Sequence, residues 1–199
     1  GLVYTLAGDN FVVAHNKDTG QVIWERQHEG FGNVEKVAVV YYGERLFVGT
    51  NDSDRGAALA LDATTGDKLW HFWGAPGPGE FGNDTWEGDS WQEGGTTPWI
   101  HPAIDPDLGT VFFTFGNVRA GSSQDGSTRG GDNLFANSLV ALDLETGAYK
   151  WHFQSIHHDI WDMDNVMAPV LVDARIRGRD RKQVVIGSKS RMYYILDRR

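Results

Sequence analysis

Short runs in which apolar and polar side chains alternate recur along the whole chain. Examples are residues 3–13, 45–61 and 110–117, which are rich in β-branched and aromatic residues. Alternation with a period of two is typical of half-buried β-strands, because successive strand residues point to opposite faces of a sheet. The pattern therefore predicts a protein built from many short strands.

Three segments repeat one another without gaps: residues 14–24, 60–70 and 141–151. Each reads Ala, five residues, Gly, three residues, Trp, and each follows a predicted strand. The larger separation between the second and third copies indicates an insertion at about 74–98, and a long ordered loop on a repetitive scaffold is often functional. A fourth copy begins at 183 and lacks its Thr-Gly and Trp, so we expect the chain to be part of a longer protein.

The repeat also predicts the fold. One unit consists of strand, turn, strand, Asp-x-x-Thr-Gly and a third strand that ends on Trp, which is most of a four-stranded antiparallel blade. We therefore predict an all-β fold, a single partial β-propeller domain over residues 1–199 with about three and a half blades. Trp24, Trp70 and Trp151 are interpreted as packing between neighbouring blades, where Gly allows close approach, and the Asp before each Thr-Gly as capping its turn.

Composition narrows the chemistry that this scaffold can support. The 199 residues contain no cysteine, which excludes disulfides, thiolate metal sites, cysteine nucleophiles and Cys-x-x-Cys redox chemistry, so a redox reaction needs a bound cofactor. The net charge of −9, from 27 acidic and 18 basic residues, argues against a nucleic-acid surface. The chain shows no targeting signal at its start and no apolar run of about 18 residues.

Candidate functional residues are those that depart from the repeat. Residues 85–99 place Trp86, Trp91 and Trp99 among glycines, outside the repeated Trp position. Aromatic faces in such a loop favour either stacking on a flat ligand or a hydrophobic lid, and composition does not separate the two. Asn117 ends a predicted strand; its side-chain oxygen suits either an Asx turn, which is the more common role, or coordination of a hard cation.

Residues 157–164, HHDIWDMD, form the most unusual segment of the chain. On a strand, Asp162 and Asp164 would point to the same face, where two carboxylates repel unless a cation or a proton lies between them. The pair therefore predicts a cation site. Zinc is disfavoured, because the adjacent His157 and His158 would point to opposite sides of a strand.

Together these motifs resemble the pyrroloquinoline quinone (PQQ)-dependent alcohol dehydrogenases, quinoproteins built on an eight-bladed β-propeller. The Ala-x5-Gly-x3-Trp repeat is similar to the tryptophan-docking motif of that family. The most specific likeness lies in residues 85–99, in the stretch from Trp99 to Asn117, in 131–147, and in 157–162 followed by Lys189. The resemblance implies a periplasmic enzyme that oxidises an alcohol or sugar hydroxyl by hydride transfer to PQQ, beside a bound Ca²⁺ or lanthanide ion. It also implies a cytochrome c or a quinone as electron acceptor, and further blades of the same propeller as packing partners.

The same resemblance assigns roles residue by residue: cofactor contacts to Trp99, Thr97 and Lys189, and metal contacts to Asn117, Asp162 and Asp164. Trp99 matches the Trp beneath the planar cofactor, and Lys189 matches the cation that hydrogen-bonds the quinone oxygens. Asp162 matches the general base. Asp164 matches the extra carboxylate of lanthanide-dependent members, although glucose-dehydrogenase-like members share WDMD, so this match does not identify the metal.

The chain departs from the family pattern at two places. Without cysteine it lacks the vicinal disulfide ring that lies above the cofactor in family members. The loop that normally supplies a Glu ligand to the metal is the shorter segment 49–56, which offers Asn51, Asp52 or Asp54 instead. A non-catalytic propeller scaffold or binding protein is therefore an alternative prediction, and a carbohydrate-binding propeller is a third. The sequence leaves the substrate, the metal and the electron acceptor open.

Overall fold

The computed structural model describes residues 1–34, 37–51, 54–118 and 125–199. Strands dominate this part of the chain, and its only helices are the short 3-10 helices η1 (Asn83–Thr85) and η2 (Ser90–Glu93), neither of which is long or apolar enough to cross a membrane. The strands are β1 (Leu2–Ala7), β2 (Phe11–Asn16), β3 (Val22–Gln27), β4 (Val39–Tyr42), β5 (Arg45–Gly49), β6 (Ala57–Asp62), β7 (Lys68–Trp73), β8 (Ala103–Asp105), β9 (Thr110–Thr114), β10 (Ser138–Asp143), β11 (Tyr149–Gln154), β12 (Val170–Ile176), β13 (Arg179–Gly187) and β14 (Tyr193–Asp197).

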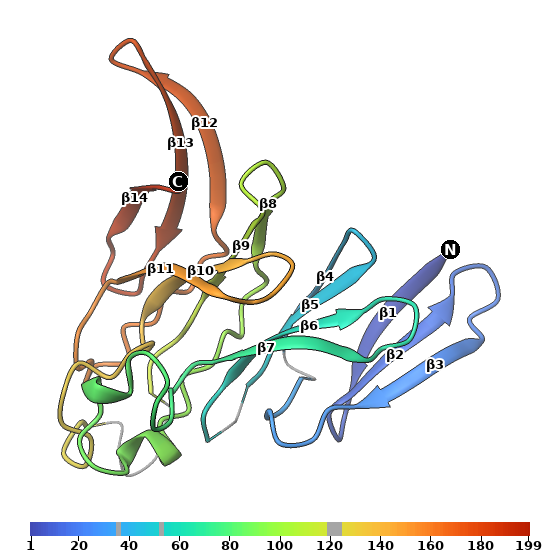
Figure 1. The fold of residues 1–199 in the computed structure, drawn as a ribbon, viewed down its shortest axis with the longest axis horizontal. Helices are drawn as coiled ribbons and strands as arrows, with labels where there is room; N and C mark the ends of the chain where they lie inside the picture. Colours follow the sequence, from blue (N-terminus) through green and yellow to red (C-terminus); the bar gives the residue numbers. More distant parts are fainter. Residues whose placement is uncertain (35–36, 52–53, 119–124) are drawn as a thin grey trace.

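These strands form four antiparallel sheets, each made of consecutive strands (Figure 1). The first sheet contains β1–β3, the second β4–β7, the third β8–β11 and the fourth β12–β14. The second and third sheets have four strands, whereas the first and fourth have three within the described residues. The arrangement confirms the predicted all-β fold of antiparallel blades.

The hydrophobic core lies between neighbouring sheets, so the middle sheets are buried on both faces. Leu46 packs with Val12 of the first sheet, whereas the next residue, Phe47, packs with Phe113 of the third. All but the last residue of β6 are buried, and this strand reads as a continuous apolar run. The outer strand β14 instead alternates between exposed and half-buried residues. The period of two is therefore clearest at the outer sheets.

The repeated tryptophans dock onto the next blade, as predicted. The Trp24 indole N–H donates to the Ala63 carbonyl at 3.2 Å, and a Cβ placed on Gly66 would lie 2.6 Å from the Trp24 ring. One blade further on, the Trp70 indole N–H donates to Leu144 at 3.4 Å, and a Cβ on Gly147 would lie 2.6 Å from its ring. Only glycine permits these approaches.

Turn capping is confirmed, whereas the predicted end of the third strand was wrong. Asp62 Oδ1 accepts the backbone N–H groups of Thr64 at 2.7 Å and Thr65 at 2.9 Å, and Asp143 makes the equivalent bonds one blade later. The strand does not end on Trp, because Trp24 is only the third residue of β3. The residues after Trp pair with the preceding strand and extend the sheet.

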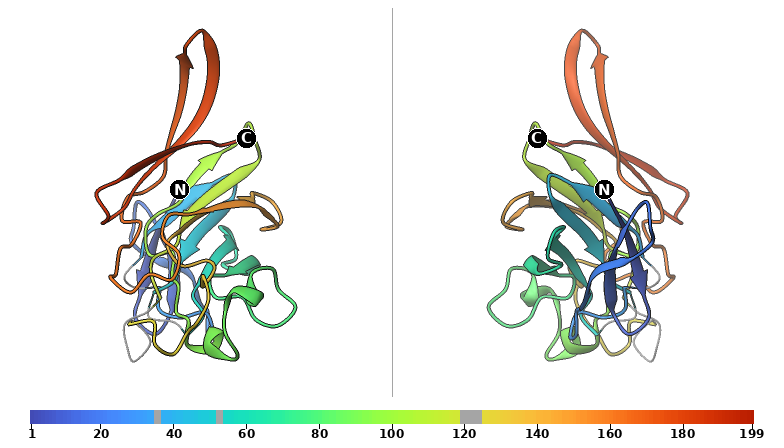
Figure 2. Two further views of the ribbon diagram at one scale, coloured as in Figure 1. Left: turned by 90° about the vertical axis from the view of Figure 1, so that its left-hand side faces the viewer. Right: turned by 90° about the vertical axis from the view of Figure 1, so that its right-hand side faces the viewer.

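The two ends of the sheets carry different connections (Figures 1 and 2). Tight turns join β4 to β5, β6 to β7, β8 to β9, β10 to β11 and β12 to β13 at one end, here called the turn end. The connections from β5, β7, β9, β11 and β13 to the strands that follow them lie at the other end, the loop end, because antiparallel strands alternate in direction. The non-repeating segments of the sequence therefore gather at the loop end.

Candidate functional site

Three charged side chains meet at the loop end. Lys189 Nζ lies 2.9 Å from Asp162 Oδ2 and 2.7 Å from Asp164 Oδ2. The two carboxylates follow β11 and the lysine follows β13, so two separate loops build the cluster. Residues 157–164 do not adopt the strand geometry from which the pairing of the two carboxylates was argued: they are irregular, and Asp162 has a φ of 59°. The carboxylates nevertheless face a common cation, the Lys189 ammonium, as their mutual repulsion requires.

The two carboxylates have different surroundings. The Asp164 side chain is only 11% exposed, whereas that of Asp162 is 47% exposed. Burial raises the pKa of Asp164, and the hydrogen bonds from Lys189 and from the Asn117 N–H, at 2.5 Å, oppose part of this rise. For Lys189, burial would lower the pKa, but the two carboxylates outweigh it and raise the pKa. Asp164 is therefore held in place by buried hydrogen bonds, and Asp162 is the more exposed of the two carboxylates.

Gly116 brings the other candidate residues to this cluster. A Cβ on Gly116 would lie 2.8 Å from Trp99 Nε1 and 2.8 Å from Asp164 Oδ1. Its backbone N–H donates to the buried Thr97 carbonyl at 3.0 Å. Asn117 follows directly; its Oδ1 accepts the Val118 N–H at 2.7 Å and its Nδ2 donates to the Asp159 carbonyl at 3.3 Å, so the bond of Oδ1 is local but is not the Asx turn that was favoured, which joins residues two apart. A residue without a side chain is therefore needed where Trp99 and Asp164 converge.

Two further glycines hold the segment that precedes Trp99. A Cβ on Gly49 would lie 1.7 Å from the Pro98 carbonyl oxygen, and one on Gly56 would lie 1.8 Å from that of Thr96. Gly49 and Gly56 are the two ends of the β5–β6 loop segment 49–56. The backbone of 96–98 therefore lies directly against this loop, and a side chain at either glycine would push Trp99 out of place.

Asp159 is a site residue to which sequence reasoning gave no role. It is 1% exposed; Oδ1 accepts the Trp161 N–H at 2.8 Å, and Oδ2 accepts the Met163 N–H at 2.6 Å and Asn137 Nδ2 at 2.5 Å. Its backbone carbonyl accepts a bond from the buried Arg129. These contacts shape the irregular loop that carries Asp162. The sequence offers little signal for this role, because the local tendency of Asp to form an Asx turn accounts only for the bond from the Trp161 N–H, two residues on.

Residues 34–199 match the family model described as PQQ, glucose/ethanol/alcohol dehydrogenase, β-propeller domain. The chain belongs to this PQQ dehydrogenase family. The match extends over most of the chain, including every residue of the cluster.

Relatives of known structure support the assignment to the PQQ dehydrogenase family. The chain is 32% identical to a quinohemoprotein alcohol dehydrogenase from Comamonas testosteroni, over 100% of this chain and 30% of that protein. The crystal structure of a quinohemoprotein alcohol dehydrogenase from the same organism matches this chain with a TM-score of 0.89, over 32% of that structure's chain. A europium-containing methanol dehydrogenase matches with a TM-score of 0.88 at 26% identity, over 38% of its chain. The chain thus spans about a third of the length of these relatives. BamB from Moraxella catarrhalis, at 17% identity and a TM-score of 0.60, shares the fold alone.

Within the PQQ dehydrogenase family pattern, the third metal ligand stays a prediction. Asn51 exchanges backbone hydrogen bonds with Asn33 at 2.6 and 2.7 Å, and Asp54 lines a separate cavity of about 520 Å³. Asp52 lies outside the described residues. Across the described residues, no group of three His, Cys, Asp or Glu side chains is placed to hold a metal ion.

The remaining tryptophans of the insertion have structural contacts. Trp86 is buried, and its indole N–H donates to the Leu134 carbonyl at 2.5 Å. Trp91 lies over the Arg55 guanidinium at 5.0 Å, and Trp73 lies over the same group at 4.3 Å. Of the three tryptophans of residues 85–99, Trp99 is the one placed next to the charged cluster, through Gly116.

Proposed function

We propose that the full-length protein is a quinoprotein dehydrogenase that oxidises an alcohol or sugar hydroxyl, with Asp162 as general base. The observation that carries the proposal is the meeting of Asp162, Asp164 and Lys189 beside Gly116 and Trp99. Membership of the PQQ dehydrogenase family supports the reaction class. The fold alone would not support this reaction class, because BamB shares the fold at only 17% identity.

The residues at the cluster fit the implied cofactor and metal. Carboxylate and amide oxygens from Asp162, Asp164 and Asn117 are hard ligands of the kind that Ca²⁺ and lanthanide ions prefer, and one similar structure is a europium-containing enzyme. The Trp99 ring offers a flat face for a planar quinone, and Lys189 offers an ammonium group. When bound, PQQ supplies the hydride acceptor and the metal polarises its carbonyl.

The protein's own groups then divide the work. Asp162, which is about half exposed, accepts the proton of the substrate hydroxyl on a carboxylate oxygen. Asp164 is held by the Asn117 N–H and orients Lys189, whose ammonium stabilises negative charge on an oxygen brought against it. Trp99 fixes the plane in which a flat ligand lies. Asp159 keeps the loop of Asp162 in shape.

The partners and the location are part of the same proposal. A dehydrogenase that reduces its cofactor must pass electrons on, and a cytochrome c or a quinone is the acceptor we propose. The quinohemoprotein names of several relatives support a redox partner of this kind. We also propose a periplasmic location, which rests on the family resemblance.

The test uses the full-length protein, reconstituted with PQQ and either Ca²⁺ or La³⁺, with dye reduction measured on methanol, ethanol and glucose. Asp162→Asn should lower kcat by about 10²–10⁴-fold, the usual contribution of a general base, while PQQ still elutes with the protein. Asp18→Asn, which removes an exposed turn carboxylate, is the matched control and should leave kcat unchanged. If neither metal gives activity and PQQ absorbance separates from the protein in gel filtration, the scaffold prediction holds instead.

A further inference from the structure

A polar cavity lies at the loop end, where the first and second sheets meet. Its volume is about 520 Å³, within the range of roughly 300–1,000 Å³ that is typical of small-molecule sites. We call it the loop-end cavity. The two sheets pack against each other through residues such as Val12 and Leu46, so the cavity lies at a complete junction and not on the outer face of an end sheet. Four connections supply its lining: Asn10, Gly30, Gly32, Asp54, Trp91 and Gln92, with Arg55 beside them.

Stacked side chains fix the walls of the loop-end cavity. Phe31, which lies between the two lining glycines in the sequence, stacks on Trp73 with ring centroids 5.1 Å apart and an interplanar angle of 19°. The Arg55 guanidinium lies 4.3 Å from the Trp73 ring centre and 5.0 Å from that of Trp91. Its Nε also donates to the Ala75 carbonyl at 2.8 Å. Because these groups are already ordered, a ligand that contacts them costs little conformational entropy on binding.

Three polar side chains of the loop-end cavity have no hydrogen-bond partner among the described residues. They are the amides of Asn10 and Gln92 and the carboxylate of Asp54. The backbone holds two of them in place, because the Asn10 carbonyl accepts the His28 N–H at 3.0 Å and the Asp54 carbonyl accepts the Gly95 N–H at 2.6 Å. An amide offers donors and acceptors, whereas a carboxylate offers acceptors only. The cavity therefore presents unused hydrogen-bonding groups of both kinds beside the ring of Trp91.

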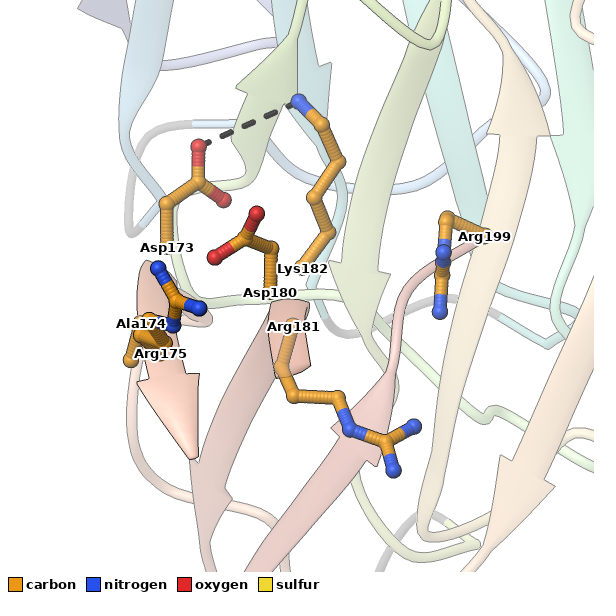
Figure 3. Close-up of a pocket in the computed structure, with 7 residues that line it drawn as sticks. All are labelled: Asp173, Ala174, Arg175, Asp180, Arg181, Lys182 and Arg199. Carbon is orange, nitrogen blue, oxygen red and sulfur yellow. Dashed lines mark ion pairs between the residues drawn. The ribbon is translucent and has the colours of Figure 1, made fainter. Parts of the chain in front are cut away.

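Two other cavities lack this combination. The cavity of about 380 Å³ in Figure 3 is lined mainly by charged side chains of the β12–β13 hairpin, of which Asp173 and Lys182 form an ion pair, and it has no aromatic ring. The cavity of about 300 Å³ beside β7 and β11 is lined mainly by aromatic rings, and the carboxylate that lines it, Glu80, pairs with Arg55. The loop-end cavity alone among these three places a ring next to unpaired polar groups.

We propose that the loop-end cavity binds a saccharide. A sugar ring has an apolar C–H face, which packs on an aromatic ring such as that of the partly exposed Trp91. The hydroxyl groups at the edge of the sugar each donate and accept hydrogen bonds, so they match the two amides and the carboxylate of Asp54. Neither Asp162 nor Lys189 lines the cavity, so this site is separate from the charged cluster and does not depend on the proposed oxidation.

Other classes of small molecule match the lining less closely. An anion would meet the carboxylate of Asp54, and the basic group of the lining, Arg55, is already paired with Glu80. A cation would lie beside the Arg55 guanidinium, which carries the same charge. A wholly apolar ligand would bury the three polar side chains without partners, which costs free energy for each of them. A neutral ligand with many hydroxyl groups avoids all three penalties.

Isothermal titration calorimetry of the full-length protein with maltose, cellobiose and D-glucose tests the proposal, without an electron acceptor so that no sugar is oxidised. At least one of these sugars should bind saturably. Gln92→Ala and Asn10→Gly should each lower the affinity about five- to tenfold, because each removes the hydrogen bonds of one amide. Asn10 has a φ of 66°, which glycine adopts without strain, so its turn is kept. Trp91→Ala should lower the affinity at least about tenfold, because the sugar loses the ring on which it packs.

Glu93→Ala is the matched control. Glu93 follows Gln92 on η2, is exposed and does not line the cavity, so its removal should leave the affinity unchanged. Asp162→Asn should also leave the affinity unchanged, because the charged cluster is not part of this site.

The proposal is overturned if none of the three sugars binds, if the Gln92 and Trp91 variants bind as tightly as the wild type, or if Asp162→Asn abolishes binding. Binding of inorganic phosphate or of tetramethylammonium in the cavity in place of a sugar would overturn it as well, in favour of an anion or a cation site. Every readout is binding, so failure of the proposed dehydrogenase activity would not affect the result.

Discussion

Replacing Gly147 with Ala tests the docking of Trp70 on the next blade. Gly147 has a φ of 71°, in the left-handed region, where Ala costs about 1–2 kcal/mol. A Cβ at this position would also lie 2.6 Å from Cδ2 and Cε3 of Trp70, well inside contact distance. Overpacking of this kind costs about 1–3 kcal/mol more, because the indole must shift and weaken its bond to Leu144.

Gly109→Ala is the matched control in the same blade. Gly109 has a φ of 55°, and nothing lies within 4 Å of the Cβ that Ala would add. It therefore carries the backbone strain without the clash. Urea titrations of the full-length protein, followed by tryptophan fluorescence and by circular dichroism, should place the free energy of unfolding of Gly147→Ala about 1–3 kcal/mol below that of Gly109→Ala.

A second comparison isolates the Trp contact itself. In a Trp70→Leu background the extra cost of Gly147→Ala over Gly109→Ala should largely disappear, because the smaller side chain no longer occupies the space of the new Cβ. Equal destabilisation by the two glycine variants in the wild type would refute the close-approach argument. An extra cost that persists without the indole would refute it as well.

Three further predictions concern the charged groups. Asp159→Asn should lower kcat at least about tenfold with little change in substrate KM, because it weakens the bonds to the Trp161 and Met163 N–H groups that shape the loop of Asp162; PQQ should still elute with the protein. Asp105→Asn should cost about 1.5–3 kcal/mol at pH 7, because the buried Arg198 loses one of its two carboxylate partners and keeps only Asp173. Burial alone would raise the pKa of Asp105, but Arg198 and a backbone N–H hold this pKa below its ordinary value. The stability that the Asp105 carboxylate contributes is therefore present above about pH 4 and is lost as pH falls through the lower folded-state pKa. The free energy of unfolding, measured from pH 7 to about 2.5, should fall less steeply in Asp105→Asn than in the wild type. Arg55→Met should lower the melting temperature more than Arg55→Lys, because methionine loses both the charge between the two tryptophan rings and the ion pair to Glu80.

The repeated parts of the fold can be predicted from the spacing of residue types along the sequence. The Asp62 carboxylate caps a turn formed by residues next to it, so spacing alone predicts its role. The interpretation of Trp24 and Trp70 as inter-blade contacts also follows from repetition, because a feature present in every unit serves the packing of units. In such cases a periodic pattern determines both the element and the neighbour that it contacts.

The irregular parts of the fold depend on buried hydrogen bonds and long-range ion pairs, which the spacing of residue types along the sequence does not reveal. The sequence of residues 157–164 does not show how their backbone turns, because the buried Asp159 carboxylate shapes the segment through three hydrogen bonds. Lys189 reaches Asp162 and Asp164 from 27 and 25 residues away.

Strand direction explains why the residues of the repeated turns and the residues of the charged cluster lie at opposite ends of the sheets. In a sheet of consecutive antiparallel strands, every second connection lies at the same end, so the Asp-x-x-Thr-Gly turns all fall at the turn end. Those turns are occupied by capping and docking, which leaves little freedom for other chemistry there. The loop end has no such constraint, because its connections do not dock the tryptophans. Insertions and charged residues can therefore vary at the loop end without disturbing the contacts between blades, and Asp162, Asp164 and Lys189 all lie on its connections.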